Sequence, residues 1–155
     1  MGIILKMKDE QIEIKCSYDY WLKFKIDIIK ATVKYIEELL ILKKTIFNDD
    51  LNYIINLYYI QAGNGEPMFS INKFINNMRL EHVDTLIYFG LGGVYSLLNK
   101  TDCDGYYSVG NSLDILHTLK KIRYDFPNND YIPFLDQLIS FFNISYEKQK
   151  MVNIY

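Results

Sequence analysis

The residues whose types and spacing could do chemistry lie together near the middle of the chain, at residues 101–105 (Thr-Asp-Cys-Asp-Gly). Asp102 and Asp104 flank the thiol of Cys103, and Gly105 follows at once. Two carboxylates at this spacing can ligate a cation, contact a basic partner or accept backbone N–H groups in a turn. A small hydrolase-like or metal-binding enzyme that uses Asp102 and Asp104 is therefore one function that the sequence leaves open.

The calcium interpretation fails at the two ends of the motif. Asp-x-Asp-Gly resembles the middle of an EF-hand loop, in which alternate carboxylates ligate calcium and a glycine allows a sharp turn. With Gly105 as that glycine, the first ligand position falls on Lys100 and the last on Asn111. An ammonium cannot ligate calcium, and an amide offers no bidentate carboxylate. The sequence therefore favours a structural turn, in which Asp102 and Asp104 accept backbone hydrogen bonds and Gly105 takes a positive φ.

Other residues with catalytic potential do not form a recognisable set. The carboxylates beside Cys103 disfavour the thiolate that a nucleophile needs. His82 and His117 lie far apart in the sequence, and the sequence alone leaves open whether one of them pairs with Cys103. Residues 90–93 (Gly-Leu-Gly-Gly) lack the spacing and the Lys-Ser/Thr end of a phosphate-binding loop. They predict a bend where backbones approach closely. We assign no catalytic residue, cofactor or metal from the sequence.

Composition restricts the class of protein. The chain has 155 residues, of which 50% are hydrophobic and 23% charged, with a formal net charge of -2. This balance is typical of a globular domain and argues against nonspecific nucleic-acid binding. The longest apolar runs, at residues 39–42 and 86–91, are far shorter than a bilayer span, and residues 1–10 lack a secretory signal pattern. Two cysteines make no disulfide framework, so we expect a reduced cytoplasmic protein.

The periodicity of apolar residues predicts strands at both ends of the chain and helices between them. Alternation over residues 11–16 and a turn at 9–10 predict a hairpin with residues 3–8. The helices are expected at residues 17–42 with Ser17 as the cap, at 48–62 with a Gly- and Pro-containing break at 62–67, at 108–124 with Ser108 or Asn111 as the cap, and at 132–142. Residues 70–78 are expected as a short helix or turn, and Asp84 is expected to cap an apolar segment to residue 94 that Gly90, Gly92 and Gly93 interrupt. A closing strand is expected at 151–155. The sequence therefore predicts an α+β fold in a single domain, residues 1–155. A mostly helical body would carry a small antiparallel sheet formed by the N-terminal hairpin and the C-terminal strand.

Two tyrosines after the acidic pair favour a role in protein binding. Tyr106 and Tyr107 follow Gly105 directly, and tyrosine is enriched at the centres of protein interfaces. We expect both rings to be exposed on a polar loop. Together with Asp102 and Asp104, they are the candidate partner-binding residues, and the carboxylates would face a basic partner surface.

The chain resembles a group of small, functionally uncharacterised bacterial proteins that share a central Ser/Thr-Asp-Cys-Asp-Gly motif. The likeness rests on residues 101–105, on the aromatic segment 17–24 (Ser-Tyr-Asp-Tyr-Trp-Leu-Lys-Phe), and on the acidic turn, helix and strand over residues 128–155. Thr101 stands where the motif usually has serine, and residues 45–80 diverge. The resemblance itself implies no activity.

Proteins of this size and character occur as cytoplasmic immunity proteins beside bacterial toxins. By that analogy, the leading hypothesis is a protein that neutralises a cognate toxin by covering its active or substrate-binding surface. Its partner would be a protein, with no part for nucleic acid or membrane.

Overall fold

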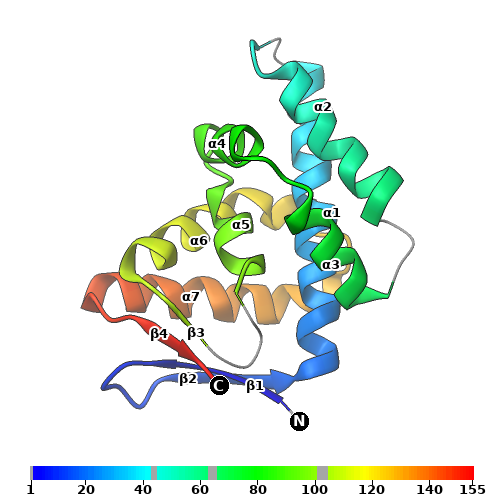
Figure 1. Cartoon of the computed structure of the whole chain (residues 1–155). Coiled ribbons are helices and arrows are strands. Elements are labelled where there is room, and N and C mark those ends of the chain that lie inside the picture. The colour runs from blue at the N-terminus through cyan, green and yellow to red at the C-terminus, as the bar shows by residue number, and fades with distance from the viewer. Residues whose placement is uncertain (1, 43–44, 63–65, 101–104) are drawn as a thin grey trace.

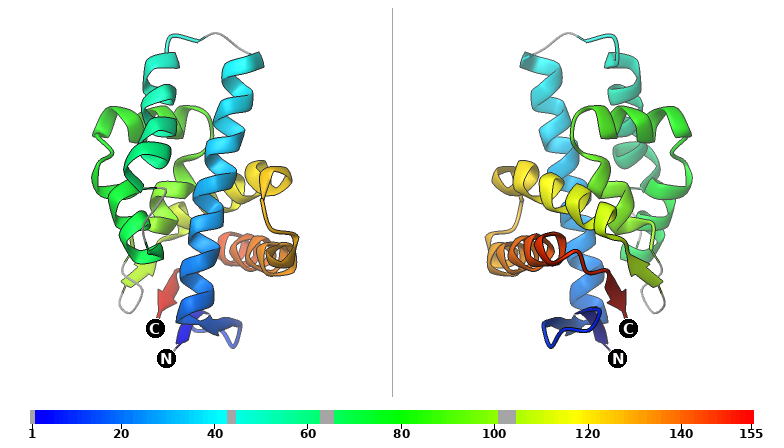
Figure 2. Two further views of the ribbon diagram at one scale, coloured as in Figure 1. Left: turned by 90° about the vertical axis from the view of Figure 1, so that its right-hand side faces the viewer. Right: turned by 90° about the vertical axis from the view of Figure 1, so that its left-hand side faces the viewer.

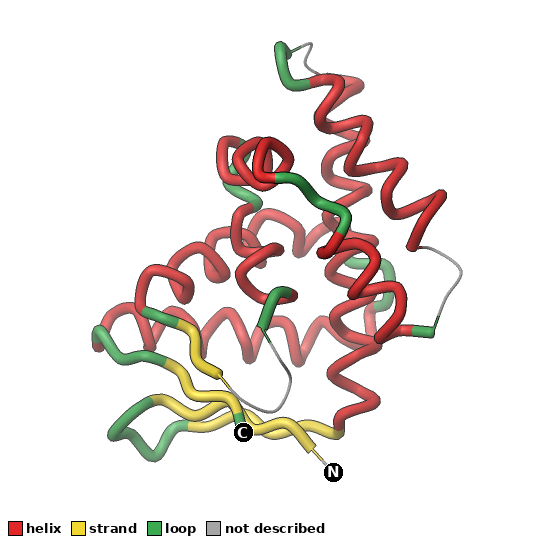
Figure 3. Tube along the Cα trace, viewed as in Figure 1, coloured by secondary structure: helices red, strands yellow, loops and turns green. Residues whose placement is uncertain are grey.

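The fold, obtained as a computed structural model, is α+β: a helical body that rests on a small antiparallel sheet (Figures 1 and 3). The structure describes residues 2–42, 45–62, 66–100 and 105–155. The elements in these ranges are β1 (Gly2–Met7), β2 (Glu13–Ser17), α1 (Tyr18–Leu42), α2 (Asn48–Asn56), the π-helix η1 (Leu57–Ala62), α3 (Pro67–Asn76), α4 (Leu80–Tyr88), α5 (Gly92–Leu98), β3 (Gly105–Tyr107), α6 (Val109–Ile122), the 3-10 turns η2 (Arg123–Asp125) and η3 (Asn129–Tyr131), α7 (Ile132–Lys148) and β4 (Val152–Ile154). The predicted fold class is confirmed.

The sheet brings the two ends of the chain together, as the sequence predicts. Its strand order is β2-β1-β4-β3, so β4 lies between β1 and β3. Leu5 opposes Ile154 across the β1–β4 pair, and Gly105 opposes Ile154 on the other side. Alternate side chains of β1, among them Leu5 and Met7, are buried under the helices. The sequence predicts a loop at residues 105–107, but these residues form β3, which pairs with β4, so this prediction was wrong.

Helix α1 organises the helical body. Ser17 caps it as predicted, because its Oγ accepts the backbone N–H of Tyr20 at 3.1 Å. Figure 2 shows α1 running through the middle of the molecule, with α2–α4 to one side and α7 to the other. A single face cannot serve both sides, which is why α1 buries residues around much of its circumference, including Phe24, Ile29 and Val33.

The middle helices depart from the predicted boundaries. Pro67 was expected to lie in a break, yet it opens α3, where a proline at the first position removes an N–H that has no helical partner anyway. Asp84 was expected to cap a helix, but α4 begins at Leu80. Gly90 adopts φ 73° after α4, and Gly93 lies against the backbone of α6, so the predicted bend and close approach are confirmed.

The last two helices close the core over the sheet. Ser108 and Asn111 cap α6 reciprocally, each side chain accepting the other's backbone N–H at 3.1 Å. Helix α7 continues to Lys148, beyond its predicted end near residue 142. No helix in the described ranges has both the length and the apolar character needed to cross a bilayer.

Candidate functional site

The structure separates the two tyrosines that the sequence had grouped. Tyr107 is only 1% exposed, and its hydroxyl donates a hydrogen bond to the carbonyl of Leu97 at 3.1 Å. Its ring meets Phe142 edge to face, with centroids 5.8 Å apart. The expectation that Tyr107 is exposed was therefore wrong. Neighbouring residues on a strand point to opposite faces, so only one of the pair can face solvent.

Tyr106 is the exposed member of the pair, with 51% of its surface accessible. It lies on β3, which among the described strands is at the edge of the sheet, next to β4. The Lys100 ammonium lies 5.8 Å from the ring centroid, within range of a cation–π contact. The ring is thus presented on a backbone that is fixed by β4 on one side and by the buried Tyr107 on the other.

The acidic part of the motif falls at the gap before β3. Asp102, Cys103 and Asp104 lie outside the described residues, so their predicted roles stay predictions. Gly105 is described, and its φ of 145° confirms the predicted positive value. Among the described residues a Cβ on Gly105 would meet Ile154 alone, at 4.0 Å, and the positive φ itself favours glycine here.

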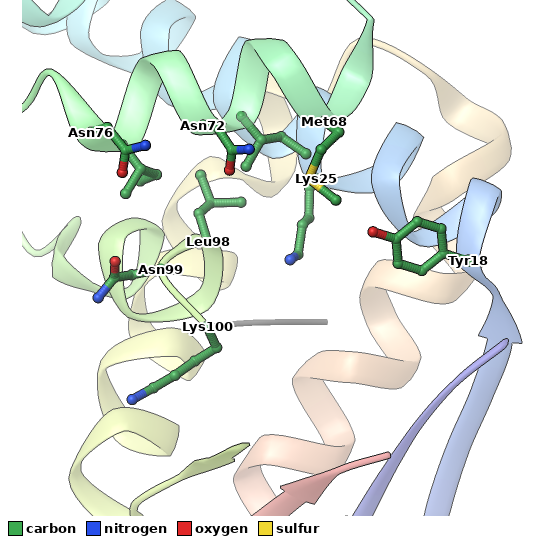
Figure 4. A pocket seen from close by; sticks show the side chains of 10 residues that line it. Tyr18, Lys25, Met68, Asn72, Asn76, Leu98, Asn99 and Lys100 are labelled. Carbon is green, nitrogen blue, oxygen red and sulfur yellow. The ribbon is translucent and has the colours of Figure 1, made fainter. Parts of the chain in front are cut away.

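A pocket of about 350 Å³ lies between the start of α1, one face of α3 and the end of α5. Figure 4 shows the Lys25 ammonium and the Tyr18 hydroxyl pointing into it, with Asn72 opposite. Lys100 extends along its rim instead. The described residues that line the pocket are Tyr18, Lys25, Met68, Ile71, Asn72, Ile75, Asn76, Leu98, Asn99 and Lys100.

Lys25 is the notable residue of the pocket, because its side chain is only 1% exposed. Its Nζ lies 5.3 Å from the centroid of the Trp21 ring, one helical turn before it. Sequence reasoning missed this residue. The available signal was its position: residues 21, 25 and 28 recur at the helical spacing of the core face, and a lysine stands in the middle of that series.

One group of described side chains has the composition of a metal site: Asp50 on α2 with Glu81 and His82 on α4. His82 is 3% exposed, and its Nε2 lies 3.7 Å from an oxygen of each carboxylate. However, its Nδ1 accepts the backbone N–H of Arg79 at 3.1 Å, so the neutral ring carries its proton on Nε2. A metal-binding histidine instead donates its second N–H to an acceptor. The tautomer therefore suits a helix cap and a contact with the carboxylates, not a ligand.

A second hollow, of about 380 Å³, contains a carboxyl group with an altered pKa. Burial raises the pKa of Asp125 to about 6, and hydrogen bonding to and repulsion by Glu38 act in the same direction. Lys34 opposes the rise. In the same hollow, the Tyr59 hydroxyl donates to Glu37 at 2.8 Å. Near pH 6 Asp125 can therefore keep its proton and donate it in a hydrogen bond to Glu38.

Exposed apolar side chains occur on the segment where α1 ends and α2 begins. This segment lies at the end of the molecule away from the sheet (Figure 1). Ile41, Leu42 and Ile46 are 83%, 79% and 93% exposed. Tyr88 of α4 is 68% exposed, and its ring centroid lies 4.6 Å from that of Phe47, the residue after Ile46. Large exposed apolar groups of this kind mark surfaces that can associate with other molecules.

Comparison with known proteins gives no match: no family model fits the chain, and neither a curated protein nor a solved structure matches it.

Proposed function

We propose that the protein binds and neutralises a cognate bacterial toxin, and that Tyr106 is an anchor of the binding surface. The observation that carries the proposal is the rigid presentation of an exposed tyrosine at a sheet edge. The resemblance to small bacterial proteins and its analogy with immunity proteins supply the class of partner.

Physical reasoning supports Tyr106 as an anchor. A tyrosine offers a large apolar ring and a polar hydroxyl at the cost of ordering only two torsions. Its backbone is already held in the β3–β4 ladder, where Tyr106 opposes Asn153. A group fixed before binding loses less entropy when the partner arrives. Asp102 and Asp104 precede it in the sequence, and their charge would speed association with a basic surface.

The test is co-expression with the product of the adjacent gene, followed by measurement of binding. If that product is a toxin, this protein should restore growth and bind it. Tyr106→Ala should weaken binding at least tenfold, as expected for an interface hot spot, and leave the melting temperature unchanged.

Tyr124→Ala is the matched control for that variant. Tyr124 is also exposed, at 86%, and also lies beside a cation, with the Arg123 guanidinium carbon 5.9 Å from its ring centroid. The Tyr124→Ala variant should bind the toxin as tightly as the unaltered protein. Equal losses in the two variants, or a neighbouring product that is harmless when expressed alone, would contradict the proposal.

A further inference from the structure

We propose that β2 binds the β2 strand of a second copy of this chain, with the two strands antiparallel and a twofold axis at Ile14. Among the described strands, β2 and β3 form the two edges of the sheet. Joining two copies at β2 would make one continuous sheet and leave β3, with Tyr106, at both outer edges. The surface is therefore distinct from the one around Tyr106, and the proposal stands whether or not the protein neutralises a toxin.

The hydrogen bonds of β1 show in which direction its backbone groups point. Ile4 and Tyr155 exchange both backbone bonds, at 3.0 and 2.9 Å, so Ile4 faces β4. The Met7 N–H donates to the carbonyl of Ile12 at 3.2 Å, so Met7 faces the other way, toward β2. Because direction alternates along an antiparallel strand, the odd-numbered residues of β1 bond to β2 and the even-numbered ones to β4.

The same alternation identifies the outward backbone groups of β2. Leu5 of β1 is odd-numbered and opposes Ile14, so Ile14 bonds to β1. Its neighbours Glu13 and Lys15 must then direct their N–H and C=O groups away from β1. Among the described strands, β2 has a neighbour on the β1 side only. Glu13 and Lys15 therefore offer the donors and acceptors that an added strand needs.

The side chains of Glu13 and Lys15 select both the partner and the register. Both residues are exposed, and their charged groups lie 3.0 Å apart. With Ile14 on the twofold axis, Glu13 of each copy lies opposite Lys15 of the other, and each such pair can exchange both backbone hydrogen bonds. Opposite charges across two strands stabilise their pairing, and like charges oppose it. A twofold axis at Lys15 would instead place two lysines opposite each other.

The other face of β2 supplies an apolar contact in the same register. Ile14 is 4% exposed, whereas Ile12 and Cys16 on either side of it are only partly buried and pack against the core. Pairing about Ile14 places Ile12 of one copy opposite Cys16 of the other. The apolar surface that both residues still expose would then leave water, which favours association.

The experiment measures self-association of the full chain by sedimentation velocity at increasing protein concentration, and we expect a monomer–dimer equilibrium. Glu13→Lys and Lys15→Glu should each weaken dimer formation by roughly tenfold or more, because each change turns both Glu–Lys pairs into like-charge pairs. An equimolar mixture of the two variants should dimerise as the unaltered protein does, since the mixed dimer again has opposite charges across its axis. The double variant Glu13→Lys/Lys15→Glu should dimerise for the same reason.

Asp84→Lys is the matched control, because it makes the same change in net charge as Glu13→Lys. Asp84 is exposed on α4, which lies away from the sheet (Figure 1). Its replacement should leave dimer formation unchanged. Circular dichroism should show that each variant keeps its fold, as expected for substitutions at exposed side chains.

Amide hydrogen exchange locates the contact. The amides of Glu13 and Lys15 should exchange more slowly as the protein concentration rises, whereas the amide of Ile14, which already bonds to β1, should not change. The proposal would be overturned by a protein that stays monomeric, by a Glu13→Lys variant that dimerises fully, or by a mixture of the two folded variants that stays monomeric. Unchanged exchange at Glu13 and Lys15, or an equal loss in Asp84→Lys, would overturn it as well.

Discussion

Replacement of Asp125 by asparagine should stabilise the protein at neutral pH. Asp125 is 7% exposed, and its pKa rises from 3.8 to about 6 in the fold. At about 1.4 kcal/mol per pKa unit, ionising this carboxyl in the folded state costs about 3 kcal/mol more than in the unfolded chain. Asparagine is neutral at every pH and its amide can donate a hydrogen bond to Glu38, so Asp125→Asn should avoid this cost.

The sign and the pH range of the effect follow from the direction of the change in pKa. A raised pKa means that the folded state holds the proton more tightly. The contribution of Asp125 is therefore fully favourable below about pH 4, and it is lost as the pH rises through about 6. Asp125→Asn should match the unaltered protein at pH 4 and exceed it by up to about 3 kcal/mol at pH 7. For a chain of this length, that gain corresponds to a rise in melting temperature of roughly 6–12 °C.

Urea unfolding, followed by the fluorescence of Trp21, measures the free energy of unfolding of the variant and of the unaltered protein at pH 4 and at pH 7. Asp130→Asn is the control, because Asp130 is exposed on the neighbouring turn and its neutralisation should change stability by less than about 0.5 kcal/mol. Glu38→Gln should give part of the gain, since it removes the negative neighbour. A variant that is equally stabilised at both pH values, or destabilised at pH 7, would refute the reasoning.

Three further changes test the sheet and its connection to α6. Deletion of residues 151–155 removes the central strand β4, with the buried Val152 and Ile154, and should leave the chain largely unfolded by circular dichroism; a truncated chain with unchanged thermal stability would contradict this. Gly105→Val should cost on the order of 1–3 kcal/mol in urea unfolding, because a β-branched residue tolerates φ 145° poorly; Gly105→Ala with no loss would remove the strain argument. Tyr107→Phe should cost about 1 kcal/mol for the hydrogen bond to Leu97, and Tyr107→Ala about 3–5 kcal/mol for the cavity; unchanged stability in both would place the ring at the surface.

The terminal sheet and the capped helices could be predicted because their signals are local or repeat along the chain. Local signals include the alternation over residues 11–16, the cap at Ser17 and the cap formed by Ser108 and Asn111. The hydrogen bonds of both caps join residues three positions apart. The start of α4 was missed because its cap is unusual. Arg79 and Leu80 are not capping residues, and the role is taken by His82, whose Nδ1 accepts the Arg79 N–H.

Strand β3 and the fate of the two tyrosines could not be predicted from local patterns. Three residues are too short for a recognisable alternation, and Gly105–Tyr107 become a strand only because β4 lies alongside. That pairing joins residues almost fifty positions apart. Once the strand exists, its pleat determines which tyrosine is buried, so the error on Tyr107 and the missed strand have one cause.

Lys25 shows how a pocket-lining residue can be concealed by the same pattern that identifies a core. The series 21, 24, 28 and 31 is apolar and predicts a buried face, and residue 25 lies on that face one turn after Trp21. A lysine on an exposed helix face needs no explanation, whereas one that is 1% exposed must have its ammonium compensated. The Lys25 side chain extends into the pocket between α1, α3 and the end of α5. A charged residue at a core position of an amphipathic helix is therefore a sequence signal for a pocket. It should be sought before motifs in loops, because the helix fixes the direction of the charge and a loop does not.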